Sequence, residues 1–280
     1  MYFVKYFICV SVVATFPKKI TKEAFSLEKG SYIFQDDMLF SETQLEAALR
    51  GGDFETPKDS EYKEGVQSGK STVGAFVLKW ENGIVPYQID SNAKCNGILC
   101  ITQLGRPEKA IKSAIKEIHE KTCIRFKERT NEKDYIQFTN IGWSKCLSYV
   151  GRIGGKQELS LTNGCSSHGI ALHEILHALG VHHEQSRSDR DNYIEIKTEN
   201  IEPGKEGNFQ KYPFTMIKTF DSPYDYDSIM HYDEHAFGKN LWSKTIVTRN
   251  GAQIGQRNRL SKYDALTLNK VYNCVEHLKN

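Results

Sequence analysis

Three things are missing from this 280-residue sequence, and each absence excludes a class of protein. No two cysteines are spaced as CxxC, so a zinc cluster held by thiolates is not expected. Basic clusters are missing and the net charge is only +2, which predicts no nucleic acid and no acidic membrane as partner. After the first residues, no run is apolar enough to span a bilayer. With 39% hydrophobic and 26% charged residues, the chain should instead fold around ordinary cores.

The sequence begins with MYFVKYFICVSVVATF, which has the pattern of a secretory signal. Lys5 precedes an apolar run over residues 6–13, and the small residues Val12 and Ala14 are spaced as in a cleavage site. A membrane anchor is the alternative, but it needs about 20 apolar residues and this run is shorter. We therefore expect a signal peptide over residues 1–14 and a secreted, extracellular protein.

Secretion changes how the cysteines are interpreted. The chain has seven, and one of them lies within the predicted signal peptide, which leaves an even set of six. In an oxidising compartment such a set indicates three disulfides, although spacing alone leaves their connectivity open. The six cysteines are Cys95, Cys100, Cys123, Cys146, Cys165 and Cys274.

Residues 15–70 are polar and end in a stretch rich in charged and turn residues, which is typical of an exposed linker. The pattern of a folded domain follows. Apolar periodicity predicts strands over 83–89, 124–126, 135–138 and 157–161, and helices over 106–122, 166–180 and 261–272. In the last helix, Ser261 and Asp264 are placed as a capping box.

The helix predicted over residues 166–180, SSHGIALHEILHALG, has apolar residues around its axis and should be largely buried. Ser166 or Ser167 can cap it. Burying its ionisable groups is costly unless they are paired. His173 and His177 lie four residues apart, so their rings share one face and can reach one ion.

Glu174 lies beside that face and can take a proton from metal-bound water without binding the metal. His183 comes six residues after His177, which on a continuing helix is too far to share the ion. Gly180 solves this, because glycine adopts the left-handed conformation that ends helices and lets the chain turn. The pattern HExxHxxGxxH therefore predicts one site with three histidine ligands.

Three neutral imidazoles with one open position are typical of catalytic zinc, whereas structural zinc is closed by four protein ligands. We expect one Zn²⁺ ion and peptide-bond hydrolysis, with Glu174 passing the proton to the leaving amine. The alternatives are ordinary packed or solvated histidines at these positions, and His182 as the third ligand in place of His183. Four further histidines lack ligand spacing: His119, His168, His235 and His277.

The motifs extend well beyond the histidine helix. They are WENGIVPY, CLSYVGRIGGKQELSLTNGC, HEILHALGVHHEQSRSDRD, PYDYDSIMHY and IGQRNRLSKYDALTLNKVYNC. Together they resemble the astacin family of secreted zinc metalloproteases, a branch of the metzincins, although Val181 stands where the family has an aromatic residue. The resemblance implies an α+β fold of two lobes, with a twisted sheet and the active-site helix in the first lobe and largely irregular chain in the second.

The resemblance also implies roles for residues outside the helix. Met230 would lie beneath the zinc ligands, and Tyr232 would be a weak fifth ligand that swings away to hydrogen-bond the oxyanion. A flexible core methionine and a buried tyrosine are the plainer interpretations. GGKQELSL resembles the family's edge strand for extended substrates. Family disulfides would pair Cys123 with Cys274 and Cys146 with Cys165, which leaves Cys95 and Cys100 to each other.

Members of this family are made as zymogens in which an aspartate of an FxGD motif binds the zinc. FQDD, residues 34–37, matches with Asp36 in place of glycine, so Asp37 would be that aspartate; a surface carboxylate is the alternative. The resemblance divides the chain into a propeptide over 15–70 and a catalytic domain over 71–280. An activating protease would cut near Lys70.

The new amino terminus at Ser71 would then lie near Glu184, whose plainer interpretation is a solvated charge. Protein or peptide substrates are the expected partners. Two rival functions remain: a secreted binding protein on an inactive protease scaffold, and a zinc hydrolase of non-peptide bonds.

Overall fold

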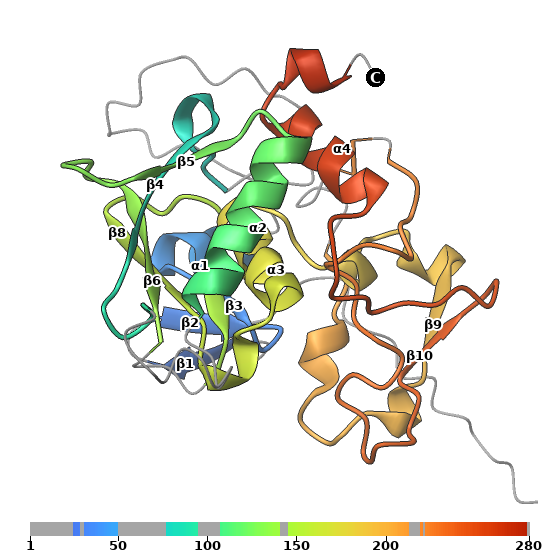
Figure 1. Cartoon of the computed structure of the whole chain (residues 1–280). Coiled ribbons are helices and arrows are strands. Elements are labelled where there is room, and N and C mark those ends of the chain that lie inside the picture. Colours follow the sequence, from blue (N-terminus) through green and yellow to red (C-terminus); the bar gives the residue numbers. More distant parts are fainter. Residues whose placement is uncertain are drawn as a thin grey trace, which may run out of the picture.

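The chain forms two lobes, one built of a sheet with helices and the other mostly irregular (Figure 1). Several predicted features lie outside the described residues: the signal peptide over 1–14, the cleavage point between Lys70 and Ser71, and both Cys95 and Cys100. None of the helices that the structure describes is long and apolar enough to cross a membrane. The computed structural model describes residues 25–28, 31–49, 77–94, 107–140, 145–212, 219–220 and 222–278.

A mixed sheet forms the centre of the first lobe. Its strands are β1 (Phe25–Glu28), β2 (Ser31–Phe34), β3 (Met38–Phe40), β4 (Ile84–Ile89), β5 (Arg125–Glu128), β6 (Tyr135–Thr139), β7 (Leu147–Tyr149) and β8 (Lys156–Ser160). Their spatial order is β1-β2-β3-β7-β8-β6-β4-β5. The middle strands are parallel to one another, whereas β7 runs antiparallel to β8. The four strands predicted from periodicity are therefore present as β4, β5, β6 and β8.

The interpretation of GGKQELSL as an edge strand is wrong. This stretch forms β8, which lies inside the sheet between β6 and β7. β7 lies between β8 and β3, and β3 pairs with it in parallel, with Met38 opposite Ser148. Because β7 has only three residues, it is too short for an alternating pattern to reveal it in the sequence.

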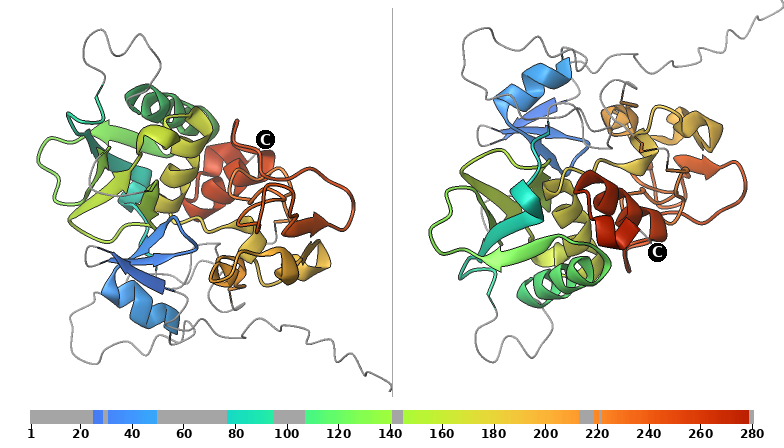
Figure 2. Two further views of the ribbon diagram at one scale, coloured as in Figure 1. Left: turned by 90° about the horizontal axis from the view of Figure 1, so that it is seen from below. Right: turned by 90° about the horizontal axis from the view of Figure 1, so that it is seen from above.

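Two helices pack side by side against this sheet (Figure 2). α2 (Glu108–Lys121) buries Ile111, Ala114 and Ile118 on one face, as its periodicity predicts. α3 (His168–Ala178) is buried along nearly its whole length, and Ser167 caps it by accepting a hydrogen bond from the Ile170 amide at 3.3 Å. The histidine helix thus lies in the core, where its polar groups need partners.

The segment over residues 31–49 is packed into the fold, although it belongs to a stretch, residues 15–70, that is polar as a whole. β2 and β3 form an antiparallel pair, and α1 (Glu42–Leu49) packs on them. In Figure 2 this blue segment lies at one end of the sheet. Phe34, Met38 and Phe40 are completely buried in a cluster that also contains Val150 and Tyr212. Apolar side chains and strand pairing therefore hold this segment in place.

The second lobe is mostly irregular, as expected, with a small two-stranded sheet of β9 (Ile194–Ile196) and β10 (Ile246–Thr248). Its core is an aromatic and aliphatic cluster that includes Phe209, Tyr224 and Tyr232. Short 3-10 helices occur in both lobes: η2 (Glu81–Gly83), η4 (Asn163–Cys165), η5 (Glu184–Ser186), η6 (Arg190–Asn192), η7 (Thr198–Asn200), η8 (Glu206–Phe209) and η9 (Val275–Leu278).

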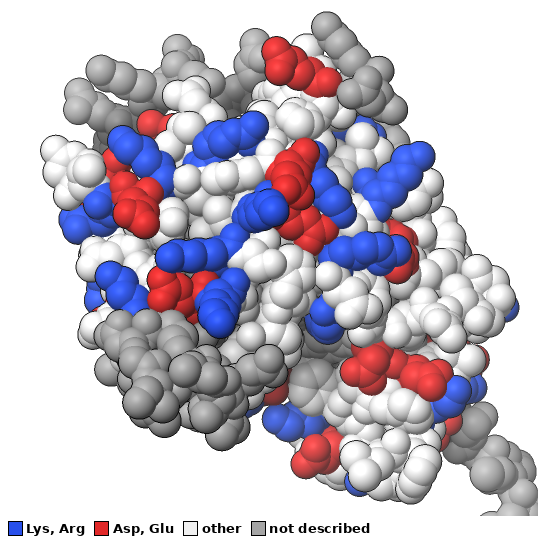
Figure 3. Space-filling view, viewed as in Figure 1, with Lys and Arg blue, Asp and Glu red and all other residues white. Residues whose placement is uncertain are grey.

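α4 (Lys262–Val271) closes the fold, and its predicted capping box is confirmed. The Ser261 hydroxyl accepts a hydrogen bond from the Asp264 amide at 2.8 Å, and the Asp264 carboxylate accepts one from the Ser261 amide at 2.9 Å. One disulfide joins Cys123 to Cys274 and another joins Cys146 to Cys165. On the face around α2, acidic and basic residues alternate (Figure 3).

Candidate metal centre

Three histidines converge at the junction of the two lobes. α3 places His173 and His177 one turn apart, and Gly180 then turns the chain with a φ of 99°. This turn brings His183 back, so that its Nε2 lies 3.3 Å from the Nε2 of His173. The ring nitrogens and one carboxylate, that of Asp37, all lie within 4.8 Å of one another.

Asp37 reaches the histidines from the turn between β2 and β3. Its Oδ2 lies 3.2 Å from the Nε2 of His173 and 3.1 Å from that of His183, and its Oδ1 lies 3.9 Å from the Nε2 of His177. Its carbonyl accepts a hydrogen bond from the Ser148 amide of β7 at 3.0 Å. The side chain is thus held against the histidines rather than lying on the surface.

Each imidazole is oriented by a hydrogen bond from its other nitrogen. The Nδ1 of His173 lies 2.9 Å from the Ile229 carbonyl, and that of His177 lies 2.8 Å from the Val181 carbonyl. Because a carbonyl can only accept, both rings carry their proton on Nδ1 and turn the Nε2 lone pair toward the centre. The Nδ1 of His183 is 2.9 Å from the side-chain oxygen of Gln35.

Burial favours the neutral form of two of these rings, those of His173 and His183. It lowers the pKa of His173 to about 3 and also lowers the pKa of His183. Burial alone would raise the pKa of Asp37, but the three histidines beside it outweigh this effect and hold its pKa well below the usual value. The centre therefore gathers lone pairs and one negative charge.

Such a set of acceptors repels itself unless a cation lies between them. The Nε2 of His177 and the Oδ1 of Asp37 are buried without a hydrogen-bond partner among the described residues. Imidazole nitrogen and carboxylate oxygen are the donor types that zinc prefers. The residues present therefore fit a single metal ion.

Glu174 lies on α3 beside the first ligand. Its side chain is only 2% exposed, and its Oε2 has no hydrogen-bond partner among the described residues. Burial, together with the charge of Asp37, raises its pKa well above the usual value. The structure thus keeps a carboxyl group at the centre that readily accepts a proton.

The segment SIMHY passes against the ligands. The Ile229 carbonyl orients His173, and the Met230 carbonyl accepts a hydrogen bond from the Glu184 amide at 3.1 Å. The Met230 side chain is buried in the main core. Tyr232 stacks obliquely on the ring of His183, with centroids 4.7 Å apart. Its hydroxyl donates a hydrogen bond to the Gln35 carbonyl at 2.8 Å, outside the ligand cluster.

Glu184 is partly buried rather than solvated, with 12% of its side chain exposed. Its carboxylate lies 3.0 Å from Arg187 and accepts a hydrogen bond from the Asp225 amide at 2.8 Å. Burial nevertheless raises its pKa to about 7. It lines a small cavity together with Met230 and Asp264, and a cation that entered this cavity would find a carboxylate there.

The remaining histidines lie elsewhere. The Nδ1 of His182 is 2.9 Å from the Tyr212 hydroxyl, so His182 is not part of the ligand cluster. His168 bridges Ser113 and Glu117 of α2, and the His119 ring accepts a hydrogen bond from the Phe126 amide.

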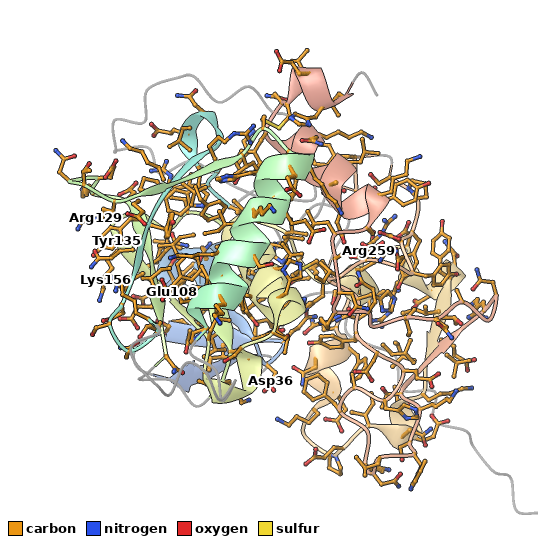
Figure 4. All side chains as sticks on the ribbon, in the orientation of Figure 1. Asp36, Glu108, Arg129, Tyr135, Lys156 and Arg259 are labelled. Atoms are coloured by element: carbon orange, nitrogen blue, oxygen red, sulfur yellow. A yellow bond between two sulfur atoms is a disulfide. The ribbon has the colours of Figure 1, made fainter. Side chains whose placement is uncertain are left out.

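Sequence reasoning missed the residues that surround Asp37. Asp36 forms ion pairs with Lys145 of the first lobe and Lys205 of the second, and Figure 4 shows it between the lobes. Its φ is 70°, a left-handed conformation that suits glycine and that aspartate tolerates better than most residues. Gln35 contacts a ligand, and no spacing rule in the sequence points to it.

Comparison with known proteins identifies a family. The family model described as Astacin, a peptidase family, matches residues 75–273. Zinc metalloproteinase nas-14 of Caenorhabditis elegans is 35% identical over 268 residues, which cover 94% of this chain and 51% of that protein. High choriolytic enzyme 1 of Oryzias latipes is 42% identical over 206 residues, covering 71% of this chain and 70% of that protein. The chain spans about half the length of the nematode relatives nas-14 and nas-15.

A solved structure is also similar. It is that of high choriolytic enzyme 1, a hatching enzyme zinc-protease from Oryzias latipes, with a TM-score of 0.62 and 40% sequence identity. The match covers 71% of this chain and 94% of that one. The α+β, two-lobed fold is therefore shared with a zinc protease of known structure.

Proposed function

The chain belongs to the astacin family of peptidases, and from this premise we propose that it is a secreted zinc-dependent endopeptidase made as an inactive precursor. The observation that carries the proposal is the cluster of His173, His177 and His183 with Asp37. Protein or peptide chains are the proposed substrates. Zinc metalloproteinases among its relatives, including nas-14, support this assignment.

His173, His177 and His183 would hold the zinc ion through their Nε2 atoms. When bound, zinc would supply a Lewis acid that lowers the pKa of water toward 7 and polarises a carbonyl group. The hydrogen bonds to Ile229 and Val181 fix the tautomers that this ligation requires. The ligand rings therefore need little reorganisation to bind the ion.

Glu174 is the proposed general base and acid. Its buried carboxyl group has a raised pKa, so it can take a proton from the attacking water and deliver it to the leaving amine. Tyr232 is the proposed weak ligand that stabilises the oxyanion, and Met230 supports the ligands from below. Burial of both residues beside the His183 turn is consistent with these roles.

The precursor form is proposed from the position of Asp37. Its carboxylate occupies the side of the histidine cluster that substrate would need, and residues 31–49 anchor it through β3 and a buried apolar cluster. We propose the division into a signal peptide over 1–14, a propeptide over 15–70 and a catalytic domain over 71–280. The family match over 75–273 lies within the proposed catalytic domain and supports this division.

Activation would follow cleavage near Lys70 by another protease. The new ammonium group at Ser71 would enter the cavity lined by Glu184, whose pKa of about 7 falls when a cation binds beside it. Amino-terminal sequencing of the active protein should give Ser71 as the first residue. A start far from Ser71 would remove this ion pair from the mechanism.

Activity itself is tested on the purified, activated protein with an unfolded protein as substrate. Cleavage should occur, and it should be lost on chelation and in Glu174→Gln. Glu276→Gln, a change on the exposed face of η9, is the matched control and should stay active. Protein that retains zinc but leaves such substrates uncut would instead favour the inactive binding scaffold or a hydrolase of other bonds.

The precursor is tested separately with Asp37→Asn, which keeps the shape of the side chain and removes its charge. The uncleaved variant should hydrolyse a small peptide at least about tenfold faster than the uncleaved wild type, since a tenfold change corresponds to about 1.4 kcal/mol. Equal rates would show that Asp37 does not block the centre.

A further inference from the structure

Gln35 lies directly beside the metal centre and has a conformation that needs an explanation. Its side chain is 2% exposed, and its φ is 51°. Residues other than glycine adopt this left-handed conformation only at an energetic cost. Such strain persists where surrounding contacts fix it, and it concentrates at functional sites.

The amide of Gln35 has only one orientation that satisfies its neighbours. Its Nε2 donates to the Gln210 carbonyl at 3.1 Å and to the Ser186 hydroxyl at 2.7 Å. The nitrogen must face these groups because a carbonyl cannot donate. The side-chain oxygen therefore faces His183 and accepts the hydrogen bond from its Nδ1 at 2.9 Å.

This bond distinguishes His183 from the other two ligands. His173 and His177 are oriented by carbonyls of Ile229 and Val181, which stay with the catalytic domain. His183 alone among the three takes its orienting acceptor from residues 31–49. The Gln35 carbonyl also holds the Tyr232 hydroxyl, at 2.8 Å. One propeptide residue thus binds both a ligand and the proposed oxyanion group.

We propose that Gln35 is a positioning residue of the precursor: it fixes His183 in the tautomer that ligates zinc, while its carbonyl keeps Tyr232 away from the metal. This inference rests on the proposed function, because it requires that the segment carrying Gln35 leaves on activation. Zinc is therefore held more tightly in the precursor than the three histidines alone would achieve. Loss of an orienting partner of this kind weakens metal binding by roughly 10- to 100-fold.

The experiment measures zinc loss from the uncleaved full chain in competition with a chromophoric chelator, a readout independent of activity. Gln35→Met, which fills the space without an acceptor, should lose zinc about 10- to 100-fold more readily than the wild type. Gln35→Glu keeps the acceptor for His183 and should retain zinc at least as well as the wild type.

Gln44→Met is the matched control. Gln44 is another buried glutamine of the same segment, but its amide donates to the Val150 carbonyl and contacts no ligand. It should retain zinc like the wild type. After activation, all variants release the same catalytic domain and should bind zinc equally.

Equal zinc retention by the Gln35→Met and wild-type precursors would overturn the inference. So would an equal loss in Gln44→Met, because the effect would then be one of segment docking. Failure of the proposed function looks different: the wild-type precursor itself would then bind no zinc, or would cut substrates before cleavage.

Discussion

The metal centre has a histidine side, formed by His173, His177 and His183, and a capping side, formed by Asp37. The two sides come from different kinds of sequence. His173, His177 and His183 belong to one short stretch, whereas Asp37 reaches them from a segment 136 residues before His173. The histidine side is rigid because α3 is buried in the main core and two of its rings bond to nearby carbonyls. The capping side depends on one apolar cluster and on β3, a strand of three residues that pairs with β2 and β7.

One side of the centre is therefore held by the chain around it, and the other is held by a distant segment that docks on it. The spacing of the three histidines is fixed within one stretch, so we expect them to stay together in a protein that lacks residues 31–49. The cap exists only while its segment is docked.

On the histidine side, the largest loss of zinc binding is expected from a substitution of His177, which is fully buried. His177→Ala should weaken zinc binding by more than roughly 100-fold, the upper end for loss of an orienting partner alone. Zinc content after dialysis, measured by atomic absorption, checks this. His168→Ala should keep its zinc, because His168 contacts only α2. Retention of zinc by His177→Ala would remove it from the ligand set.

On the capping side, the largest effect is expected at Phe40, the last residue of β3, whose side chain is completely buried. Phe40→Ala should cost about 3–5 kcal/mol of docking free energy. The Ser148 and Val150 amides bond to the segment, so their hydrogen exchange should accelerate by more than roughly 100-fold. Phe209, in the second lobe, is equally buried. In Phe209→Ala, the exchange rates of these two amides relative to those of neighbouring amides should be the same as in the wild type.

His231 tests the histidine side through pH, because its Nδ1 lies 2.7 Å from the carbonyl of Tyr232, whose ring packs on His183. Burial lowers its pKa to about 4, against 6.5 in the unfolded chain. The unfolded state then binds more protons between these values, so stability is fully present above pH 6.5 and falls as the pH drops to 4. The loss should be about 3 kcal/mol.

Urea unfolding at a series of pH values checks this. His231→Gln cannot titrate, so the difference between wild-type and variant unfolding free energies should change over pH 4–6.5 and be constant above it. Parallel curves through that window would contradict the assignment.

The smallest effect is expected at Asp36. Asp36→Gly removes partly exposed ion pairs with Lys145 and Lys205, each worth about 0–1 kcal/mol, but relieves a left-handed aspartate. The docking free energy of residues 31–49 should change by roughly 1 kcal/mol or less, as measured by hydrogen exchange of the Ser148 amide. Asp36→Asn isolates the charge: salt should weaken docking in the wild type and not in this variant.

The sequence was informative where neighbouring residues cooperate. Helix periodicity predicted α2, α3 and α4, and the capping box at Ser261 is present as expected. The spacing of His173, His177 and His183 predicted their convergence, because helix geometry and one glycine suffice to arrange it. The family itself was recognisable from the same motifs and is confirmed by the match over 75–273.

It was less informative where pairing partners are distant or elements are short. β7 has three residues and was missed, which led to the wrong choice of β8 as the edge strand. Residues 15–70 are polar as a whole, and this average concealed the apolar residues concentrated in 31–49, where Phe34, Met38 and Phe40 are fully buried.

The sequence alone therefore determined the convergence of the three histidines, since covalent spacing and the helical repeat fix how nearby side chains point. Only the tertiary structure decided what faces that set: Asp37 on the histidines, Gln35 on His183 and Tyr232, and lysines from both lobes on Asp36. Those contacts join segments far apart in the chain. Their geometry follows from the packing of the whole core rather than from any local pattern.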